Sequence, residues 1–135
     1  MAAHYLLDSN ILIAALKGTP AALLNKLSGL APARLCLSSV VLSELLTGAD
    51  KSRNPDTKRA QLAELTRYME PVPFDHAAAH AYARIRAALE SKGQVIGEYD
   101  LQIAAQAQSR DLVLVTDNLR EFKRVRELRC ENWLR

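Results

Sequence analysis

Four acidic residues lie far apart along the chain, each where a buried strand ends or an apolar helix begins. They are Asp8, Glu44, Asp100 and Asp117. Asp8 follows the apolar run 5–7, and Asp117 follows the run 112–116. A carboxylate rarely enters such surroundings without a partner, because removing its charge from water is costly. If the fold gathers these acids, the natural partner is a hard divalent cation, Mg²⁺ or Mn²⁺.

A cluster of this kind has a specific chemical use. Two carboxylates about 4 Å apart repel each other by ~4 kcal/mol at an effective dielectric constant near 20. Three or four of them therefore need a cation to stay together. A bound Mg²⁺ keeps several waters and bridges protein carboxylates to a substrate phosphate. It also lowers the pKa of a bound water and neutralises charge that develops on the phosphate. The pattern indicates hydrolysis of a phosphodiester.

Each acid also has an ordinary structural interpretation. Asp8 could cap the helix that follows it, and Asp100 could complement the dipole of a helix that it begins. Against this, Ile103 and Ala104 lie three and four residues after Asp100, so the acid shares the buried face of its helix. Glu44 has the same difficulty, because valines precede it by three and four residues. Taken jointly, the four positions favour a metal site.

Other catalytic patterns are weak or absent. His76 and His80 have a spacing that can bind zinc, but only alanines lie between them and no third ligand is evident. Cys36 and Cys130 lack metal-type spacing, and we expect reduced thiols in a cytosolic protein. The chain has neither a Gly-x-Ser-x-Gly motif nor a glycine-rich phosphate loop.

The elements that must position the acids alternate between strand and helix. The expected strands are 4–8, 35–38, 112–116 and 128–133, with 71–74 as a connector or short edge strand. The expected helices cover 11–16, 20–29, 39–48, 55–69, 75–92, 100–109 and 118–124. This alternation predicts an α/β fold with a largely parallel sheet covered on both faces. Ligands of such folds bind beyond the carboxyl ends of the strands, where Asp8 and Asp117 fall.

Bulk composition agrees with a globular enzyme. The 135 residues suit one domain, 1–135, and no apolar run approaches the ~18 residues that a membrane span needs. The first residues do not have the pattern of a signal peptide. The net charge is +3, which is compatible with a polyanionic partner. Basic residues gather in 51–59 and 120–129, as solvated helix faces or as surfaces for a polyanion.

Several stretches together resemble one family. They are Tyr-Leu-Leu-Asp-Ser-Asn-Ile-Leu-Ile (5–13), Leu-Ser-Ser-Val-Val-Leu-Ser-Glu-Leu (37–45), Ile-Gly-Glu-Tyr-Asp-Leu-Gln-Ile-Ala-Ala (96–105) and Leu-Val-Thr-Asp-Asn-Leu-Arg-Glu-Phe (114–122). As a set, and in this order, they resemble PIN-domain ribonucleases, and among these the VapC toxins of bacterial toxin–antitoxin pairs.

The resemblance assigns roles to individual residues. Asp8, Glu44 and Asp100 take the three acidic metal-site positions of the family. The polar position beside the first acid is Asn10, and the threonine that closes the fourth strand is Thr116.

The fourth acid departs from the family pattern. Many PIN domains carry it two residues after that threonine, where this chain has Asn118, whereas Asp117 comes one residue early. Either Asp117 turns into the site, or Asn118 acts through its carbonyl oxygen.

The resemblance further implies a three-layer α/β/α sandwich, a homodimer, and a small antitoxin whose C-terminal segment covers the active groove. Its implied substrate is RNA, often a structured loop of transfer or ribosomal RNA. Two other functions remain open on the residues alone. One is a metal-dependent phosphatase with Asp8 as the covalent nucleophile, and the other is a catalytically silent module that binds RNA or a partner.

Overall fold

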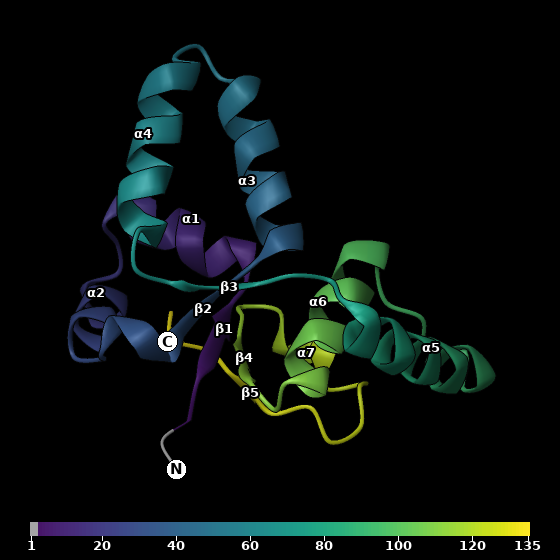
Figure 1. Ribbon diagram of the computed structural model, residues 1–135. Coiled ribbons are helices and arrows are strands. Elements are labelled where there is room, and N and C mark those ends of the chain that lie inside the picture. Colours follow the sequence, from purple (N-terminus) through teal and green to yellow (C-terminus); the bar gives the residue numbers. More distant parts are fainter. Residues whose placement is uncertain (1–2) are drawn as a thin grey trace.

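The computed structural model, which describes residues 3–135, is built around a five-stranded sheet in the order β3-β2-β1-β4-β5 (Figure 1). The strands are β1 (Tyr5–Leu7), β2 (Leu35–Ser38), β3 (Glu70–Val72), β4 (Val113–Val115) and β5 (Cys130–Glu131). Every neighbouring pair is parallel. The prediction of a largely parallel sheet is confirmed, and the segment around Pro71 forms an edge strand, where a residue without an N–H is tolerated.

Helices cover the sheet and extend beyond it. They are α1 (Ser9–Lys17), α2 (Ala21–Ser28), α3 (Ser39–Asp50), α4 (Pro55–Thr66), α5 (His76–Ser91), α6 (Glu98–Ser109) and α7 (Leu119–Phe122), with a short 3₁₀ turn, η1 (Pro32–Arg34). In Figure 1, α5, α6 and α7 lie on one side of the strands, α1 and α2 lie on the other, and α3 and α4 form a projecting hairpin. The arrangement is the expected α/β/α sandwich. Within residues 3–135, no helix has the length and apolar character needed to cross a membrane.

The central strands are short and apolar because helices cover both of their faces. Leu6 and Leu7 of β1 and Leu114 and Val115 of β4 have no exposed surface. Strands buried on both faces lose the alternation of polar and apolar residues that marks a one-sided sheet. The two strands also pair directly, with Leu6 opposite Leu114 and Leu7 opposite Val115. Their carboxyl ends therefore meet at one edge of the sheet.

Side-chain caps begin three of the helices, α1, α3 and α5. Asp75 accepts a hydrogen bond from the backbone N–H of Ala78 (3.0 Å) and so begins α5 as predicted. Gly18 ends α1 in the left-handed region, with φ of 75°. Several boundaries differ from the prediction: α1 begins at Ser9, two residues early, and α4 ends at Thr66, three residues early. Helix α6 begins at Glu98, also two residues early, because the backbone carbonyl of Gly97 already accepts from Leu101 (2.9 Å).

A largely buried polar network ties α6 to the sheet. The Gln106 side chain accepts a hydrogen bond from the Ser38 hydroxyl and donates to the carbonyl of Val72 (3.0 Å) and the hydroxyl of Ser39 (3.4 Å). Ser38 in turn accepts from the backbone N–H of Val40 (3.0 Å) and caps α3. Because each buried polar atom has a partner, the network fixes α3 and α6 against the ends of β2 and β3.

Candidate active site

Asp8 lies at the carboxyl end of β1 and is almost completely buried, with 4 % of its surface exposed. One carboxylate oxygen accepts from the backbone N–H of Ser9 (2.8 Å), which makes Asp8 the N-cap of α1. The other accepts from the Thr116 hydroxyl (2.7 Å) at the end of β4. The structural and chemical interpretations of this acid are therefore compatible, since the cap uses one oxygen and leaves lone pairs on both.

Asp100 lies in the first turn of α6 and is the most perturbed acid of the site. Its pKa is raised to about 7, first by burial, then by a hydrogen bond with Glu121 and by the charges of Asp8, Glu121 and Glu44. Four acids from four separate segments thus act on one another at this edge of the sheet.

Glu44 joins the group from α3. Its pKa is raised by burial and, to a smaller extent, by the charge of Asp8. The helix begins at the Ser38 cap at the end of β2, so Glu44 lies in its second turn, above the same sheet edge as Asp8. Acids that raise a neighbour's pKa are typical of functional sites, and a cation bound among them would relieve their repulsion.

Three polar residues hold the acids in place. Asn10 donates to Asp8 at 3.5 Å, and its side-chain oxygen accepts from the backbone N–H of Asp117 (3.2 Å). Thr116 accepts from the backbone N–H of Asn118 (3.0 Å) while its own hydroxyl donates to Asp8. The Asn118 amide donates to Glu121 (2.9 Å). All three residues named from the sequence contact an acid or the loop that carries one.

Asp117 lies away from the other acids. Its carboxylate accepts from the Asn132 amide (2.9 Å) and pairs with Arg135 (3.7 Å), and its side chain is exposed. The expectation that Asp117 completes the cluster therefore does not match its contacts. The bond from its backbone N–H to Asn10 fixes the turn so that the side chain faces the C-terminal segment.

Glu121, rather than Asp117, lies close enough to Asp100 to raise its pKa, and the sequence reasoning missed it. It lies in the first turn of α7, three residues after Asn118 and four after Asp117. The available signal was an acid one helical turn beyond the end of a buried strand, a spacing that lets a side chain reach back toward that strand. A four-residue helix has no periodicity that would reveal this direction.

The donor set suits a hard divalent cation. Within residues 3–135, no three Asp, Glu, His or Cys side chains already stand close enough to enclose an ion. Asp8, Glu44 and Glu121 all raise the pKa of Asp100, so the four acids lie near one another and their charges repel. All candidate ligands offer oxygen, as Mg²⁺ and Mn²⁺ prefer. A cation between them would lower the pKa of Asp100 and draw the acids together.

The remaining candidates lie outside this group. His76 and His80 are exposed on α5 with their Nε2 atoms 3.1 Å apart. Cys36 and Cys130 are both free thiols. Burial raises the pKa of the Cys130 thiol to about 11, so it stays protonated and unreactive at neutral pH.

Comparison with known proteins covers the part of the chain that carries the four acids. The family model described as "PIN domain" matches residues 5–128. The chain is 40% identical over 129 residues to the tRNA(fMet)-specific endonuclease VapC of Shigella flexneri, covering 96% of this chain and 97% of that protein. It is 38% identical over 130 residues to Ribonuclease VapC2 of Haemophilus influenzae, covering 96% and 98%.

Solved structures give the same result. The DNA-bound VapBC of Salmonella typhimurium contains a chain that superposes with a TM-score of 0.90 at 39% identity, covering 98% of this chain and 99% of that one. The VapBC2 complex of Rickettsia felis, bound to a DNA fragment from its promoter, gives a TM-score of 0.89 at 36% identity, covering 96% and 98%.

Proposed function

Because the chain belongs to the PIN-domain family, we propose that it is a metal-dependent endoribonuclease and the toxin of a toxin–antitoxin pair. The observation that carries the proposal is that Asp8, Glu44 and Glu121 come from three other segments and lie close enough to Asp100 to raise its pKa, which burial and these acids bring to about 7. Relatives named for tRNA(fMet) cleavage support transfer RNA as the substrate class.

Asp8 and Asp100 are the proposed metal ligands. The Thr116 hydroxyl and the Ser9 N–H fix the Asp8 carboxylate, so it does not reorient between cycles. Asp100 is only partly buried and stands at the open end of α6, where a cation and a substrate phosphate can both reach it. Mg²⁺ is the proposed ion, with Mn²⁺ as its substitute, and when bound it supplies Lewis-acid stabilisation of the phosphate charge.

Glu44 and Glu121 are proposed to position the attacking water and the metal's own waters. Burial and the charge of Asp8 raise the pKa of Glu44, which makes its carboxylate a better proton acceptor than an exposed glutamate. Glu121 receives a hydrogen bond from Asn118, which orients it toward the site. In this assignment Asp117 serves the fold through Asn132 and takes no part in catalysis.

The proposed partner is a small antitoxin of the VapB type. An apolar groove of about 280 Å³ runs between α1, α3 and α4 and ends at Glu44. Ile13 and Leu16 line it and are 42 % and 41 % exposed, unusually high for large apolar side chains. The solved VapBC complexes support a partner of this type, and this apolar groove is its proposed docking surface. A homodimer is the proposed state of the toxin.

The phosphatase alternative has less support. A phosphate-accepting aspartate needs a free carboxylate oxygen and usually a second acid two residues later, but Asn10 stands at that position and donates to Asp8. Trapping of a phosphorylated Asp8 would restore this alternative. A silent binding module would show no metal-dependent cleavage at all.

One experiment tests the proposed function directly. RNA ends are sequenced after brief expression of the native protein and of Asp8→Ala, with the purified proteins then assayed in Mg²⁺, Mn²⁺ and EDTA. We expect new ends at a few transfer RNA positions for the native protein alone, and cleavage that stops in EDTA. Cleavage that persists in EDTA, or in Asp8→Ala, would refute the metal-site assignment.

A further inference from the structure

A second charged feature lies at the other end of α6. A cleft of about 610 Å³ opens between the C-terminal half of α5, the end of α6 and the segment that follows α7. We call it the α5 cleft. Its floor is formed by Ile85, Leu89 and Val125, and its walls carry four basic residues, Arg84, Lys92, Arg124 and Arg126. Figure 1 shows this segment after α7 looping out beside α5 and α6.

The basic residues of the α5 cleft keep their charge available. Within residues 3–135, none of the four has a carboxylate oxygen within 4.0 Å. Of the two acids in the cleft, Asp111 is already paired with Arg129 (3.0 Å), which leaves Glu127 as the opposing charge. Elsewhere on the same helix, Arg86 pairs with Glu90 (3.3 Å), as expected for a solvated helix face.

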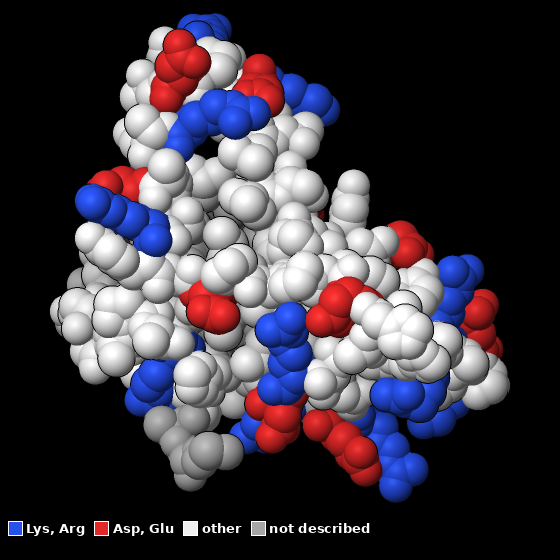
Figure 2. Space-filling view, viewed as in Figure 1, with Lys and Arg blue, Asp and Glu red and all other residues white. Residues whose placement is uncertain are grey.

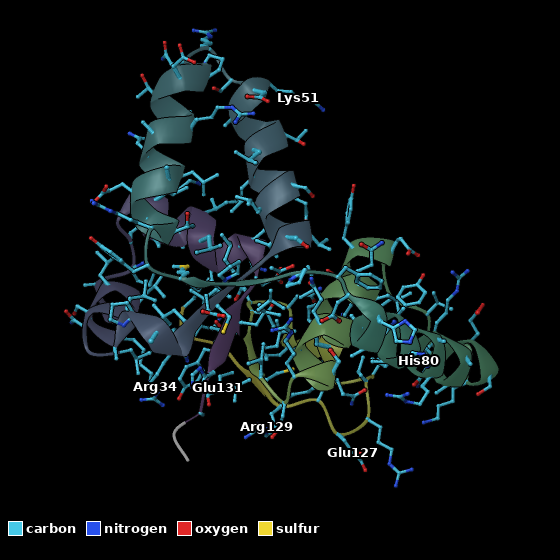
Figure 3. All side chains as sticks on the ribbon, in the orientation of Figure 1. Arg34, Lys51, His80, Glu127, Arg129 and Glu131 are labelled. Atoms are coloured by element: carbon cyan, nitrogen blue, oxygen red, sulfur yellow. The ribbon has the colours of Figure 1, made fainter. Side chains whose placement is uncertain are left out.

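The other basic cluster of the sequence behaves differently. At the tip of the α3/α4 hairpin, Arg59 binds Asp50 through two hydrogen bonds of 2.7 Å. Figure 2 shows blue and red side chains side by side at this tip. Figure 3 places Lys51 there, at the opposite end of the molecule from Glu127 and Arg129. Charges at the tip are therefore partly neutralised, and the surface is convex, whereas the α5 cleft is concave and has an excess of positive charge.

We propose that the α5 cleft binds the phosphate backbone of the RNA outside the cleavage site. Guanidinium groups match phosphate oxygens in geometry and charge, and a concave site with an apolar floor strengthens their field. The position also fits: Arg124 lies one helical turn after Glu121, and the end of α6 at Gln108 is ~12 Å along the helix axis from Asp100. One RNA strand of about four helical nucleotides covers that length.

This inference rests on the proposed function, because it assumes that the acid cluster cleaves RNA. It adds a length requirement. A substrate of two or three nucleotides occupies the acid cluster alone, whereas a stem–loop reaches both sites. We expect the α5 cleft to select for long or structured RNA while leaving the chemistry of the bond unchanged.

The test compares two triple variants of the full chain with equal loss of charge. The first, Arg84→Gln/Lys92→Gln/Arg126→Gln, changes the cleft and spares Arg124, whose guanidinium donates to the carbonyl of Val95 (3.1 Å). The matched control at the hairpin tip is Lys51→Gln/Arg53→Gln/Lys58→Gln. Binding of a fluorescent transfer RNA stem–loop is measured in an Asp100→Asn background over a range of salt concentrations.

We expect the cleft variant to bind the stem–loop about ten-fold or more weakly at 100 mM salt, with the slope of log K against log salt reduced by about 2. The control changes affinity less than about two-fold. With Asp100 restored, KM for the stem–loop rises in the cleft variant at unchanged kcat, and trinucleotide cleavage is unaffected. Equal losses in both triple variants, or no loss in either, would overturn the proposal.

Two further outcomes separate this proposal from the proposed function. If the native protein cleaves no RNA, the proposed function fails, but the binding comparison in the Asp100→Asn background still decides whether the α5 cleft holds RNA. If the cleft variant loses trinucleotide cleavage as strongly as stem–loop cleavage, the substitutions have damaged the acid cluster and a separate RNA site is rejected. Tight binding of an acidic peptide in place of RNA would also reject it.

Discussion

Two polar groups lie where α3 and α6 meet the edge of the sheet, and they are built in opposite ways. In the Gln106 network every buried polar atom has a protein partner. In the acid cluster, Asp100 is surrounded by groups that raise its pKa to about 7. The buried polar residues that stabilise the fold have hydrogen-bond partners within the protein. The acids of the proposed active site instead need a bound ligand to balance their charge.

Helix α6 carries a member of each group. Asp100 lies in its first turn, and Gln106 lies six residues later, buried between Ser38 and Val72. The Gln106 network fixes α6 against the sheet. The helix therefore tolerates the unfavourable charge of Asp100 at its N-terminal end. Strain at a functional site persists only where the surrounding structure fixes it.

The largest expected effect comes from removing the charge of Asp100, at the N-terminal end of α6. Asp100→Asn should lower RNA cleavage at least about 100-fold, the scale seen when one charge-stabilising group is lost. Its free energy of unfolding in EDTA should be unchanged or raised, because a repelling charge has gone. Cleavage kinetics and urea titration measure the two effects. An unfolded Asp100→Asn protein would instead mean that the residue is a structural cap.

At Gln106, by contrast, we expect substitution to lower the stability of the protein. Gln106→Leu should lower the free energy of unfolding by about 2–3 kcal/mol, because the hydroxyl of Ser38 and the carbonyl of Val72 lose a buried partner. Urea denaturation measures the loss, and Gln102→Leu, at a partly exposed position of the same helix, is the control. Loss of cleavage without any loss of stability would contradict a purely structural role.

The pH dependence of stability should distinguish the two groups as well. The folded pKa of Asp100, about 7, lies above its ordinary value of about 3.9, so the folded protein binds this proton more tightly than the unfolded chain. Without metal, stability should therefore fall as the pH rises from about 4 to 7. Because Asp100 is partly exposed, we expect a loss of about 1–2 kcal/mol, less than the full shift implies.

Denaturation at pH 5, 6 and 7 in EDTA measures this loss, and Asp100→Asn should flatten the profile. Glu44 contributes in the same direction, since its pKa is also raised. Identical pH profiles for the native protein and the variant would show that folding does not raise the pKa of Asp100.

The smallest expected effect concerns the fourth acid. Glu121→Gln should weaken Mn²⁺ binding by about ten-fold, whereas Asp117→Asn should change it less than about two-fold, because Asp117 is engaged with Asn132 and Arg135. Calorimetry with Mn²⁺ measures both affinities. A larger loss for Asp117→Asn would restore that residue to the site.

The sequence predicted the parts of the site that local pattern controls. Asp8 and Thr116 follow buried apolar runs, and parallel strands must bring such ends together. It also predicted that Asp100 stands near the start of a helix with an apolar face, although α6 begins two residues earlier than expected.

Long-range contacts determined the rest. The direction of Asp117 depends on Asn132, fifteen residues later, and no local periodicity encodes such a contact. Glu121 was missed because α7 is only four residues long. The Gln106 network was missed for a related reason, since a single glutamine among alanines looks like a surface residue until Ser38 is placed beside it.

The bond between Thr116 and Asp8 joins residues 108 positions apart in the chain. A ribosome adds about 5–20 residues each second, so roughly 5–20 seconds separate the synthesis of Asp8 from that of Thr116. A nascent or prematurely terminated chain that lacks Thr116 cannot assemble this pair of strand ends. A site that depends on this bond therefore cannot form before Thr116 has been synthesised.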